Sequence, residues 1–487
     1  MINSFPRVRF APSPTGYLHV GGLRTALYNF LFAKKNNGKF ILRIEDTDRN
    51  RFVEGAAEQL LQTMKQVGLV YDEGPDQPGE YGPYVQSERL EIYKQHVQTL
   101  VENGQAYHCF CTPERLQELK EEQQRNKLPQ AKYDQHCLHL TKDEINENLA
   151  NNVPHVIRLN VKPGNTISFD DMIRGKVDFN SDVVDDQILI KSDGFPTYHL
   201  ANVIDDHLMK ITHVIRGEEW LSSTPKHVLL YNYFGWELPM FSHLPLLLNP
   251  DKSKLSKRQG DVAVEDYLAK GYFTEALINF VALLGWNAGD DREFYLLEEL
   301  VEHFSMERVN KAGAVFNVEK LDWLQGEHLR SRSIEELLPL VKAELEKTKY
   351  AAGNWSDDFL SKIIEAMKER IKFVKELFEN SSYFFEQPTE YDQKVIDKRW
   401  KDDSVELLNK FSAKVESLTS ESKEDYERIL HETVEESGAG VGRLIHPVRL
   451  VLSGVGTGPG IYDLLVILGQ KEILERIQLG IAAINKN

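Results

Sequence analysis

Two short polar motifs, far apart in the chain, have residue types that suit the binding of phosphate groups. Near the N-terminus, Ala11–Gly22 reads Ala-Pro-Ser-Pro-Thr-Gly-Tyr-Leu-His-Val-Gly-Gly and leads into an apolar stretch with helical spacing. Far downstream, Lys254–Arg258 reads Lys-Leu-Ser-Lys-Arg within a polar segment. The start of a helix offers free N–H groups and the positive end of a dipole, and cations complement phosphate directly. Together the two motifs predict a site for the phosphates of ATP.

The first motif requires a strand, a tight loop and a helix. Arg7–Ala11 alternates and is rich in β-formers, which predicts a strand, and Leu23–Ala33 has apolar residues at helical spacing. Gly21 and Gly22 carry no side chain, so a nucleotide can approach the backbone closely. His19 can donate a hydrogen bond to phosphate without permanently adding charge. The alternative is a glycine-rich junction with an incidental histidine.

The second motif supplies the cations Lys254, Lys257 and Arg258 on a segment whose composition is typical of a surface loop. Such a loop can close over a triphosphate and neutralise the charge that develops as pyrophosphate leaves. A short cationic run taken alone is more often simply solvated.

Both motifs resemble the two signatures of class I aminoacyl-tRNA synthetases. The usual second histidine of the first signature is Gly22 here, a form associated with the glutamyl branch, so backbone amides must replace its phosphate contact. Arg43–Arg49, Gly194–Asn202 and Val214–Trp220 also resemble bacterial glutamyl-tRNA synthetases. The resemblance is dense over about residues 5–330 and looser beyond. It implies His19, Lys254 and Lys257 as catalytic groups, and Gly21, Gly22, Lys254, Lys257 and Glu219 as the ATP site.

A pocket for glutamate must hold two carboxylates and one ammonium group. Planar, bidentate arginine suits a carboxylate best, and we expect Arg9 to bind the side-chain carboxylate and Arg216 the α-carboxylate. Glu45, at the end of the predicted strand 40–44, suits the ammonium group. Tyr198 and Asn202 are spaced to share one helix face. A surface ion pair is the commoner fate of any one of these residues alone. By resemblance the pocket comprises Arg9, Ala11, Ser13, Glu45, Tyr198, Asn202, Arg216 and Trp220.

All three cysteines lie in one short segment, as Cys109-Phe-Cys111 and Cys137-Leu-His139. Four such ligands suit tetrahedral Zn²⁺, so we expect a closed structural zinc site. The alternative is a set of reduced thiols in a degenerate site. The resemblance implies a structural zinc in this insert, as some bacterial glutamyl enzymes have, with a tyrosine as an alternative fourth ligand, and Tyr133 lies four residues before Cys137. The choice between His139 and Tyr133 stays open at this stage.

Composition restricts the class of protein. The 487 residues include 27% charged and 41% hydrophobic residues, values typical of globular proteins. No secretory leader or membrane span is visible, so we expect a cytoplasmic protein. The net charge of −17 argues against general nucleic-acid affinity but allows a specific RNA partner that is recognised by shape. Nothing suggests a large apolar patch, and we expect a monomer.

These anchors predict an α/β fold with a Rossmann-like parallel-sheet catalytic domain, an α+β insert and an all-helical C-terminal region. Residues 156–161 and 166–169 are expected to be strands of the insert. The glycine-rich run Gly454–Gly460 has the wrong spacing for a dinucleotide fingerprint, and we expect a turn between helices. The expected domains are residues 1–108 and 187–260 for the catalytic fold, 109–186 for the acceptor-binding insert, 261–330 for a stem-contact domain and 331–487 for the anticodon-binding domain.

The predicted reaction has two steps. With Mg²⁺ and ATP, glutamate becomes an adenylate, and the terminal ribose of tRNA(Glu) then accepts the glutamyl group. Related enzymes need tRNA before they activate glutamate, and we expect the same here. Alternatives are a form that also charges tRNA(Gln), a pantothenate-synthetase-like ligase, a shortened paralogue that modifies a tRNA base, and an inactive RNA-binding relative. The helical C-terminal third disfavours the two shorter enzymes, and the intact His19, Lys254 and Lys257 disfavour the inactive relative.

Overall fold

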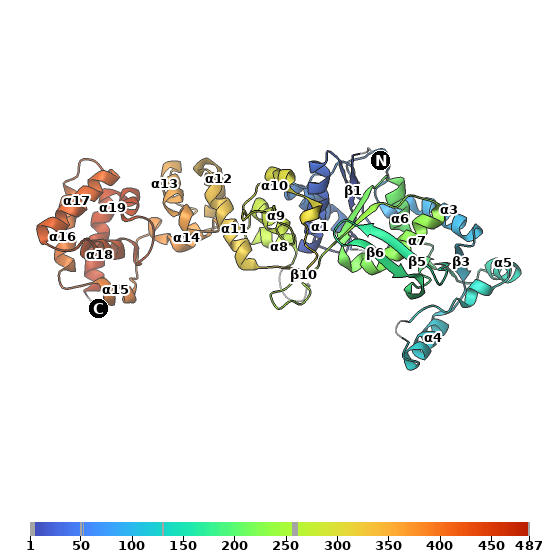
Figure 1. The fold of residues 1–487 in the computed structure, drawn as a ribbon. Coiled ribbons are helices and arrows are strands. Elements are labelled where there is room, and N and C mark those ends of the chain that lie inside the picture. Colours follow the sequence, from blue (N-terminus) through green and yellow to red (C-terminus); the bar gives the residue numbers. More distant parts are fainter. Residues whose placement is uncertain (1–4, 49–50, 52, 129–130, 256–261, 486–487) are drawn as a thin grey trace. The chain divides into compact units, whose positions relative to one another are not determined.

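The computed structural model describes residues 5–48, 51, 53–128, 131–255 and 262–485. The chain forms two compact units. Unit 1 contains the residues up to Lys270 together with Thr274–Val318, and unit 2 contains Gly271–Phe273 and the residues from Glu319 onward. Figure 1 shows unit 1 in blue to yellow and unit 2 in yellow-orange to red.

Unit 1 is built on a mainly parallel sheet. β1 pairs in parallel with β2, β8 with β9, and β9 with β5, while β5 and β6 form an antiparallel hairpin. The Thr212 N–H donates to the Arg7 carbonyl at 2.9 Å, which places β1 beside β8. The resulting order is β2-β1-β8-β9-β5-β6, with bounds β1 (Arg7–Phe10), β2 (Lys39–Leu42), β5 (Thr166–Asp171), β6 (Gly175–Asn180), β8 (His213–Gly217) and β9 (Met240–Leu244).

The strand order reverses at β1 and β8. The chain leaves β1 through α1 (Val20–Lys35) to reach β2 on one side, and it leaves β8 through α7 (Thr224–Phe234) to reach β9 on the other. In open parallel sheets, ligands bind in the crevice that such a reversal leaves at the carboxyl ends of the strands. The sheet therefore positions a site where β1 and β8 end, and the predicted strand 7–11 and helix 23–33 are confirmed.

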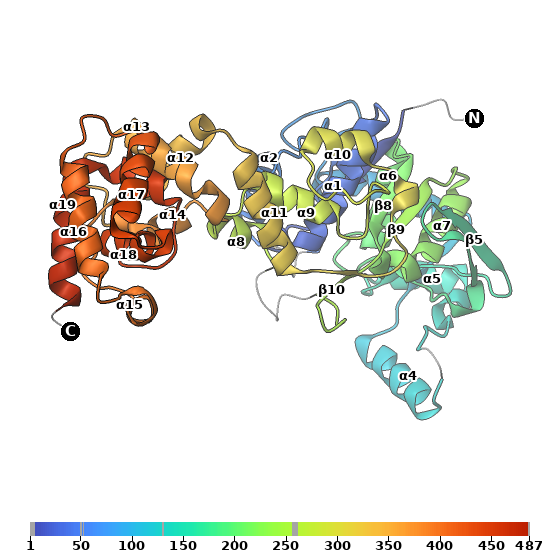
Figure 2. The same ribbon diagram turned by 60° about the vertical axis from the view of Figure 1, so that its left-hand side comes forward.

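A smaller antiparallel sheet carries the cysteine segment. It contains β3 (Ala106–Cys109), β4 (Val156–Leu159) and β7 (Ile188–Ile190), with α4 (Pro113–Arg125) and α5 (Lys142–Ala150) between β3 and β4. α4 projects from this sheet in both ribbon views (Figure 1 and Figure 2). The strand predicted at 166–169 exists but belongs to the large sheet, because β5 pairs with β9 through Asp171 and Phe241.

The remaining elements of unit 1 are mostly helical. α6 begins at Tyr198, as its predicted helical spacing requires, and directly precedes β8. The short strands β10 and β11 pair in parallel. The bounds are α2 (Ala56–Gln66), α3 (Leu90–Glu102), α6 (Tyr198–Leu208), β10 (Leu247–Leu248), α8 (Val264–Ala269), α9 (Thr274–Ala282), α10 (Leu297–His303) and β11 (Ala314–Val315).

The described part of unit 2 is entirely helical, as predicted. Its apolar core unites helices α12 to α19. The predicted helical stretch 359–378 is interrupted between Met367 and Glu376, and the glycine-rich run Gly454–Gly460 is the predicted turn between α18 and α19. The helices are α11 (Val318–Ser331), α12 (Ile334–Leu345), α13 (Asp357–Met367), α14 (Glu376–Asn380), α15 (Gln393–Arg399), α16 (Ser404–Glu416), α17 (Lys423–Ser437), α18 (Val441–Ser453) and α19 (Ile461–Ile484).

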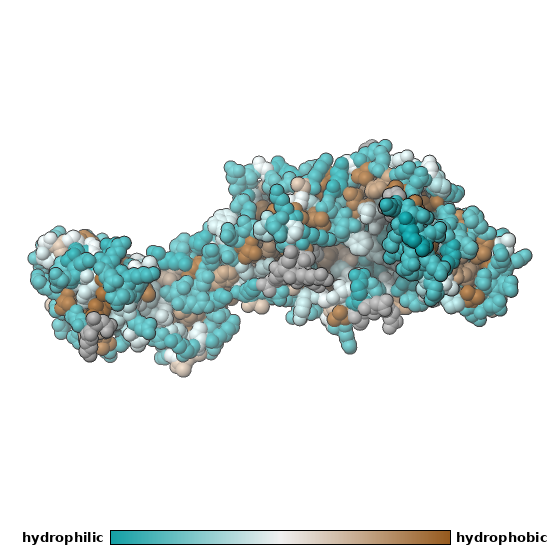
Figure 3. Space-filling view, turned by 90° about the horizontal axis from the view of Figure 1, so that it is seen from below, coloured by the Kyte–Doolittle hydropathy of each residue, from teal (hydrophilic) through white to brown (hydrophobic). Residues whose placement is uncertain are grey.

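The face in Figure 3 is mostly hydrophilic, with hydrophobic residues scattered over it. Among the described helices, none is both long enough and apolar enough to span a membrane.

Candidate active site

His19 caps the helix that follows β1. Its Nδ1 accepts a hydrogen bond from the Gly21 N–H at 2.9 Å, and α1 begins at Val20. An accepting Nδ1 has no proton, so the neutral ring carries its proton on Nε2. The cap therefore fixes the tautomer in which Nε2 is the donor. Gly21 and Gly22 lie in the first helical turn, whose N–H groups have no carbonyl partner within the helix.

The position of Gly22 leaves little room for a side chain. A Cβ atom there would lie 3.1 Å from Leu18 Cδ1 and 3.7 Å from the Phe10 ring. The histidine that most class I synthetases carry at this point would have to displace these apolar groups. Backbone N–H groups are what this part of the site offers to a ligand.

The chain that follows the second motif packs against the start of this helix. The Val20 N–H donates to the Val262 carbonyl at 2.8 Å, and the Val264 N–H donates to the Leu18 carbonyl at 2.9 Å. On the other side of the second motif, Lys254 bridges to Leu248, and the Leu255 N–H donates to the Leu247 carbonyl at 2.9 Å. The segment that contains the second motif is therefore anchored at β10 on one side and beside His19 on the other. Lys257 and Arg258 lie outside the described residues.

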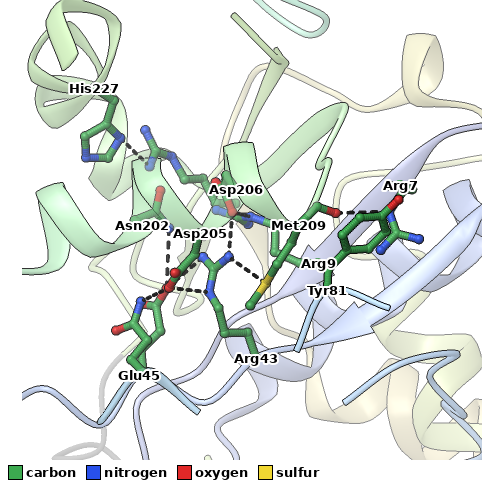
Figure 4. Close-up of polar contacts among 12 residues, drawn as sticks. Arg7, Arg9, Arg43, Glu45, Tyr81, Asn202, Asp205, Asp206, Met209 and His227 are labelled. Atoms are coloured by element: carbon green, nitrogen blue, oxygen red, sulfur yellow. Dashed lines mark hydrogen bonds and ion pairs between the residues drawn. The ribbon is translucent and has the colours of Figure 1, made fainter. Parts of the chain in front are cut away.

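Asp206 on α6 joins two arginines at the carboxyl ends of the first two strands. Its Oδ1 lies 3.0 Å from Arg9 Nε and 2.7 Å from Arg43 Nη1 (Figure 4). Arg43 Nη2 in turn donates to Glu45 Oε1 at 3.0 Å. All four side chains are buried. Burial opposes ionisation of Asp206, but Arg9 and Arg43 outweigh that effect and lower its pKa.

Asn202 belongs to the same cluster. Its Nδ2 lies 3.4 Å from Glu45 Oε1 (Figure 4). With the amide turned over, the nitrogen donates to Asp206 at 3.2 Å and the oxygen accepts from Arg9 at 3.3 Å and from Arg43 at 3.1 Å. The second orientation satisfies both ends of the amide, and we adopt it. The structure thus brings the predicted residues Arg9, Glu45 and Asn202 together through Asp206, which the sequence analysis did not single out.

Arg216, at the end of β8, is held differently. Its donors reach four neutral groups: His243 Nε2 at 3.2 Å, His227 Nδ1 at 3.1 Å, the Tyr198 hydroxyl at 3.2 Å and Thr224 Oγ1 at 2.8 Å. The side chain is buried, and within the described ranges no carboxylate lies within ion-pair distance of it. A buried guanidinium without a carboxylate is costly unless an anionic ligand compensates its charge.

The remaining predicted residues flank this arginine or the end of β1. The Tyr198 ring packs on Trp220 with centroids 4.3 Å apart. The Glu45 N–H donates to the Pro12 carbonyl at 3.0 Å, which places Ala11–Ser13 alongside Glu45. Glu219 is exposed just beyond β8, and within the described part of the chain no hydrogen bond or ion pair ties it to the other predicted groups.

Three histidines near Arg216 are neutral: His227 and His243 are buried and contact it, and His199 is half-buried behind His227. Burial, with Arg216 nearby, lowers the pKa of His227 well below its ordinary value. Burial also lowers the pKa of His199, to about 3, and the pKa of His243. The sequence analysis missed these residues and Asp206. Polar residues within otherwise apolar runs, such as His243 in Met240–Leu244, were the available signal.

The cysteines form a second cluster. The Sγ atoms of Cys109, Cys111 and Cys137 lie within 4.8 Å of one another. The Tyr133 hydroxyl lies 3.4 Å from Cys109 Sγ and 3.2 Å from Cys111 Sγ, and it accepts from the Cys137 N–H at 3.0 Å. His139 is exposed and is not part of the cluster. Of the two candidates for a fourth ligand, the structure brings Tyr133 to the thiols.

Unit 2 contains a polar cluster that the sequence analysis did not predict. The Tyr383 hydroxyl and Arg449 Nη1 are buried without a hydrogen-bond partner. Both face Gly458, where a Cβ atom would lie 2.9 Å from the hydroxyl and 3.2 Å from Nη1. Arg370 is close enough to lower the pKa of Arg449, after burial, the larger cause. Gly458 thus leaves two buried donors of this cluster without a hydrogen-bond acceptor among the described residues.

Comparison with known families agrees with this arrangement. Residues 6–323 match the model of the catalytic domain of class I tRNA synthetases (E and Q), and residues 332–481 match an anticodon binding domain. Two curated relatives are described as glutamate–tRNA ligases. The protein of Chlorobium chlorochromatii (strain CaD3) is 51% identical and that of Chloroherpeton thalassium (strain ATCC 35110 / GB-78) 53% identical, with 99% and 97% of both chains covered, respectively.

A solved structure is similar along the whole chain. It is a glutamate tRNA ligase from Elizabethkingia meningosepticum in complex with its amino acid. The two chains share 40% identity, and the TM-score is 0.94 over 99% of this chain and 100% of the other.

The neutral histidines predict how stability depends on pH. Unfolded histidines bind protons near their ordinary pKa of about 6.5, whereas His199, His227 and His243 resist protonation in the folded state. The unfolded state therefore binds more protons below that pH, and stability falls as the pH falls, by up to about 1.4 kcal/mol per pH unit for each histidine. We expect the melting temperature of unit 1 in calorimetry to drop from pH 7 to pH 5.5. The melting temperature should depend less steeply on pH in His199→Gln than in the wild type. An equal pH dependence in the two proteins would contradict a neutral His199 in the folded state.

Proposed function

The chain belongs to the glutamyl and glutaminyl group of class I tRNA synthetases, and we propose that the crevice at β1 and β8 joins L-glutamate to tRNA(Glu) at the expense of ATP. The observation that carries this proposal is Arg216, a buried cation with no carboxylate partner among the described residues, at the end of the strand next to the one that leads into the His19-capped helix. A crevice with an uncompensated cation next to a phosphate-binding helix start suits an anionic amino acid that reacts with ATP.

ATP binds with its phosphates at the start of α1, accompanied by Mg²⁺. The Nε2–H of His19 and the Gly22 N–H face the phosphates, Gly21 lets them approach the backbone closely, and Glu219, Lys254 and Lys257 complete the ATP site. The α-carboxylate of glutamate attacks the α-phosphorus of ATP, and a carboxyl oxygen–phosphorus bond forms. The bond between the α-phosphorus and the oxygen that bridges it to the β-phosphorus breaks. Lys254 and Lys257 stabilise the leaving pyrophosphate. The anchoring of this segment beside His19 supports these roles.

Glutamate binds between the two arginines. Arg9 takes the side-chain carboxylate and Arg216 the α-carboxylate, and Glu45 takes the ammonium group. Burial raises the pKa of Glu45 against the opposing effect of Arg43, and a bound ammonium group lowers it again. The walls of the pocket are Ala11, Ser13, Tyr198, Asn202 and Trp220.

The second step transfers the glutamyl group. The terminal 2′-hydroxyl of tRNA attacks the carbonyl carbon of the mixed anhydride, and AMP leaves. No side chain acts as a nucleophile, so catalysis consists of positioning and charge stabilisation. Because tRNA and ATP are cytoplasmic, we place the reaction in the cytoplasm. We also propose that the enzyme acts as a monomer.

The reaction is tested by charging and pyrophosphate-exchange assays with purified tRNA(Glu) and tRNA(Gln). We expect exchange that requires glutamate, ATP and tRNA. Arg216→Ala should lower kcat/KM for glutamate about a hundred-fold, because two hydrogen bonds to a charged group are lost. Arg292→Ala, which removes an exposed cation paired with Glu299, is the matched control.

The outcomes separate the candidate functions. Charging of both tRNAs identifies a form that does not discriminate between them. Absence of exchange with any tRNA would sink the ligase assignment and favour an inactive RNA-binding protein.

A zinc ion fits the cysteine cluster. Three thiols within 4.8 Å of one another and the Tyr133 hydroxyl supply four donors at the spacing that tetrahedral zinc needs, with zinc–sulfur distances of about 2.3 Å. We assign Cys109, Cys111, Cys137 and Tyr133 as ligands. A bound zinc ion cross-links β3 to the turn at Cys137 and has no part in the reaction.

Metal content distinguishes the two fourth ligands. We expect about one zinc per chain by elemental analysis, full retention in His139→Ala, and loss on dialysis against a mild chelator in Tyr133→Phe. Cys137→Ser serves as the zinc-free reference. Zinc loss in His139→Ala together with retention in Tyr133→Phe would reverse the assignment.

Unit 2 binds the anticodon of the tRNA in this proposal. The unsatisfied Tyr383 hydroxyl and Arg449 Nη1, with Gly458 between them, are suited to the polar edge of an unstacked base or its phosphate.

Kinetics with tRNA as the varied substrate test this site. Arg449→Ala should raise the KM for tRNA about ten-fold or more, while the KM values for glutamate and ATP stay unchanged. Arg428→Ala, whose cation is already paired with Asp425 and Glu432, should match the wild type. A wild-type KM for tRNA in Arg449→Ala would remove the anticodon role from this cluster.

A further inference from the structure

A continuous chain of hydrogen bonds, buried except at its His199 end, runs behind Arg216. Asp171 Oδ2, at the end of β5, lies 2.7 Å from the ring Nδ1 of His243 and also accepts a hydrogen bond from the backbone N–H of His243 at 3.0 Å. His243 Nε2 accepts from Arg216 Nε at 3.2 Å. On the other side, His227 Nδ1 accepts from Arg216 Nη1 at 3.1 Å, and His227 Nε2 lies 3.0 Å from His199 Nδ1. Asp171 and His243 have fully buried side chains.

Arginine fixes the proton positions along this chain. A guanidinium donates only, so His243 Nε2 must hold a lone pair, and the proton of the neutral ring must be on Nδ1, facing Asp171. The same reasoning puts the proton of His227 on Nε2, from which it donates to His199. Hydrogen bonds from His243 and from the Arg174 N–H outweigh burial and lower the pKa of Asp171, which is therefore ionised and accepts from His243.

We propose that Asp171 and His243 form a positioning pair that orients the Arg216 guanidinium toward the glutamate carboxylate. Asp171 selects the tautomer of His243, and His243 Nε2 then holds Arg216 Nε. The proposal rests on the carboxylate-binding role of Arg216 described above. Neither residue touches the substrate.

This arrangement explains why the Asp171 carboxylate reaches Arg216 only through His243. Asp206 contacts Arg9 through Nε. A carboxylate in direct contact with Arg216 would compensate its charge and compete with the α-carboxylate of glutamate for its donors. A neutral imidazole between Asp171 and Arg216 supplies direction and leaves the positive charge available to the ligand.

Asp171 also has a local role, which decides the choice of variants. Its Oδ1 accepts the N–H groups of Ile173 and Arg174 in the turn before β6. An Asp171 variant therefore changes this turn as well as His243. Variants at His243 separate the two effects, because they leave the turn unchanged.

The test compares His243→Gln with His243→Asn. Glutamine places its amide near the position of Nε2 and keeps an acceptor for Arg216, whereas asparagine reaches only the position of Nδ1 and keeps a donor for Asp171. Kinetics of tRNA charging give separate KM values for glutamate and ATP. We expect His243→Asn to raise the KM for glutamate about ten-fold with the KM for ATP unchanged, and His243→Gln to stay within about three-fold of the wild type. Asp171→Asn should behave like His243→Asn.

Asp170→Asn is the control, because Asp170 is the exposed neighbour of Asp171 on the same strand. Melting temperatures accompany all variants. Equal KM values for glutamate in the two His243 variants, or parallel rises in both KM values that follow the loss of melting temperature, would overturn the positioning role. A wild-type protein that charges no tRNA would instead refute the proposed function, so the two failures are distinguishable.

Discussion

Two arginine charges buried at the carboxyl ends of neighbouring strands set the constraint on which the rest of the site depends. A cation removed from water must be compensated, and the chain does this in two ways. Arg9 shares Asp206 with Arg43 inside the fold. Arg216 contacts neutral acceptors, so compensation of its charge requires an anionic ligand. The fold thus gives Arg9 a carboxylate partner of its own, whereas among the described residues Arg216 has none.

The strand order turns this electrostatic asymmetry into a reactive site. Because β1 and β8 are neighbours, the loop after β1 and the end of β8 lie at the same edge of the sheet, where open parallel sheets bind their ligands. The helix start capped by His19 faces the crevice from β1, and the segment that carries the lysines returns to Val20 through Val262. In the function that we propose, Arg216 presents the amino-acid carboxylate to phosphates at the helix start.

Local sequence predicted the elements and residue types that lie close together in the chain. The strand at Arg7, the helix after Gly22 and the helix that begins at Tyr198 follow from periodicity, and the family resemblance supplied the pocket residues. The contacts that hold them could not be predicted in this way. Asp206 and His243 each pair with residues far away in the sequence, and such pairing is decided by the tertiary fold. The choice of Tyr133 over His139 depends likewise on where the chain turns, since both residues flank Cys137 in sequence. The sequence of β5 is compatible with a strand in either sheet, and only its pairing with β9 shows that it belongs to the large one.

The central claim is that Arg216 keeps its charge for the substrate. A crystal structure of this protein with L-glutamate bound tests it most directly. We predict a glutamate carboxylate within hydrogen-bond distance of the Arg216 guanidinium. His243 Nε2 should still accept from Arg216 Nε, and no carboxylate of the protein should contact Arg216. A bound glutamate whose two carboxylates both avoid Arg216, or an Arg216 that pairs with an acidic side chain of the protein, would contradict it.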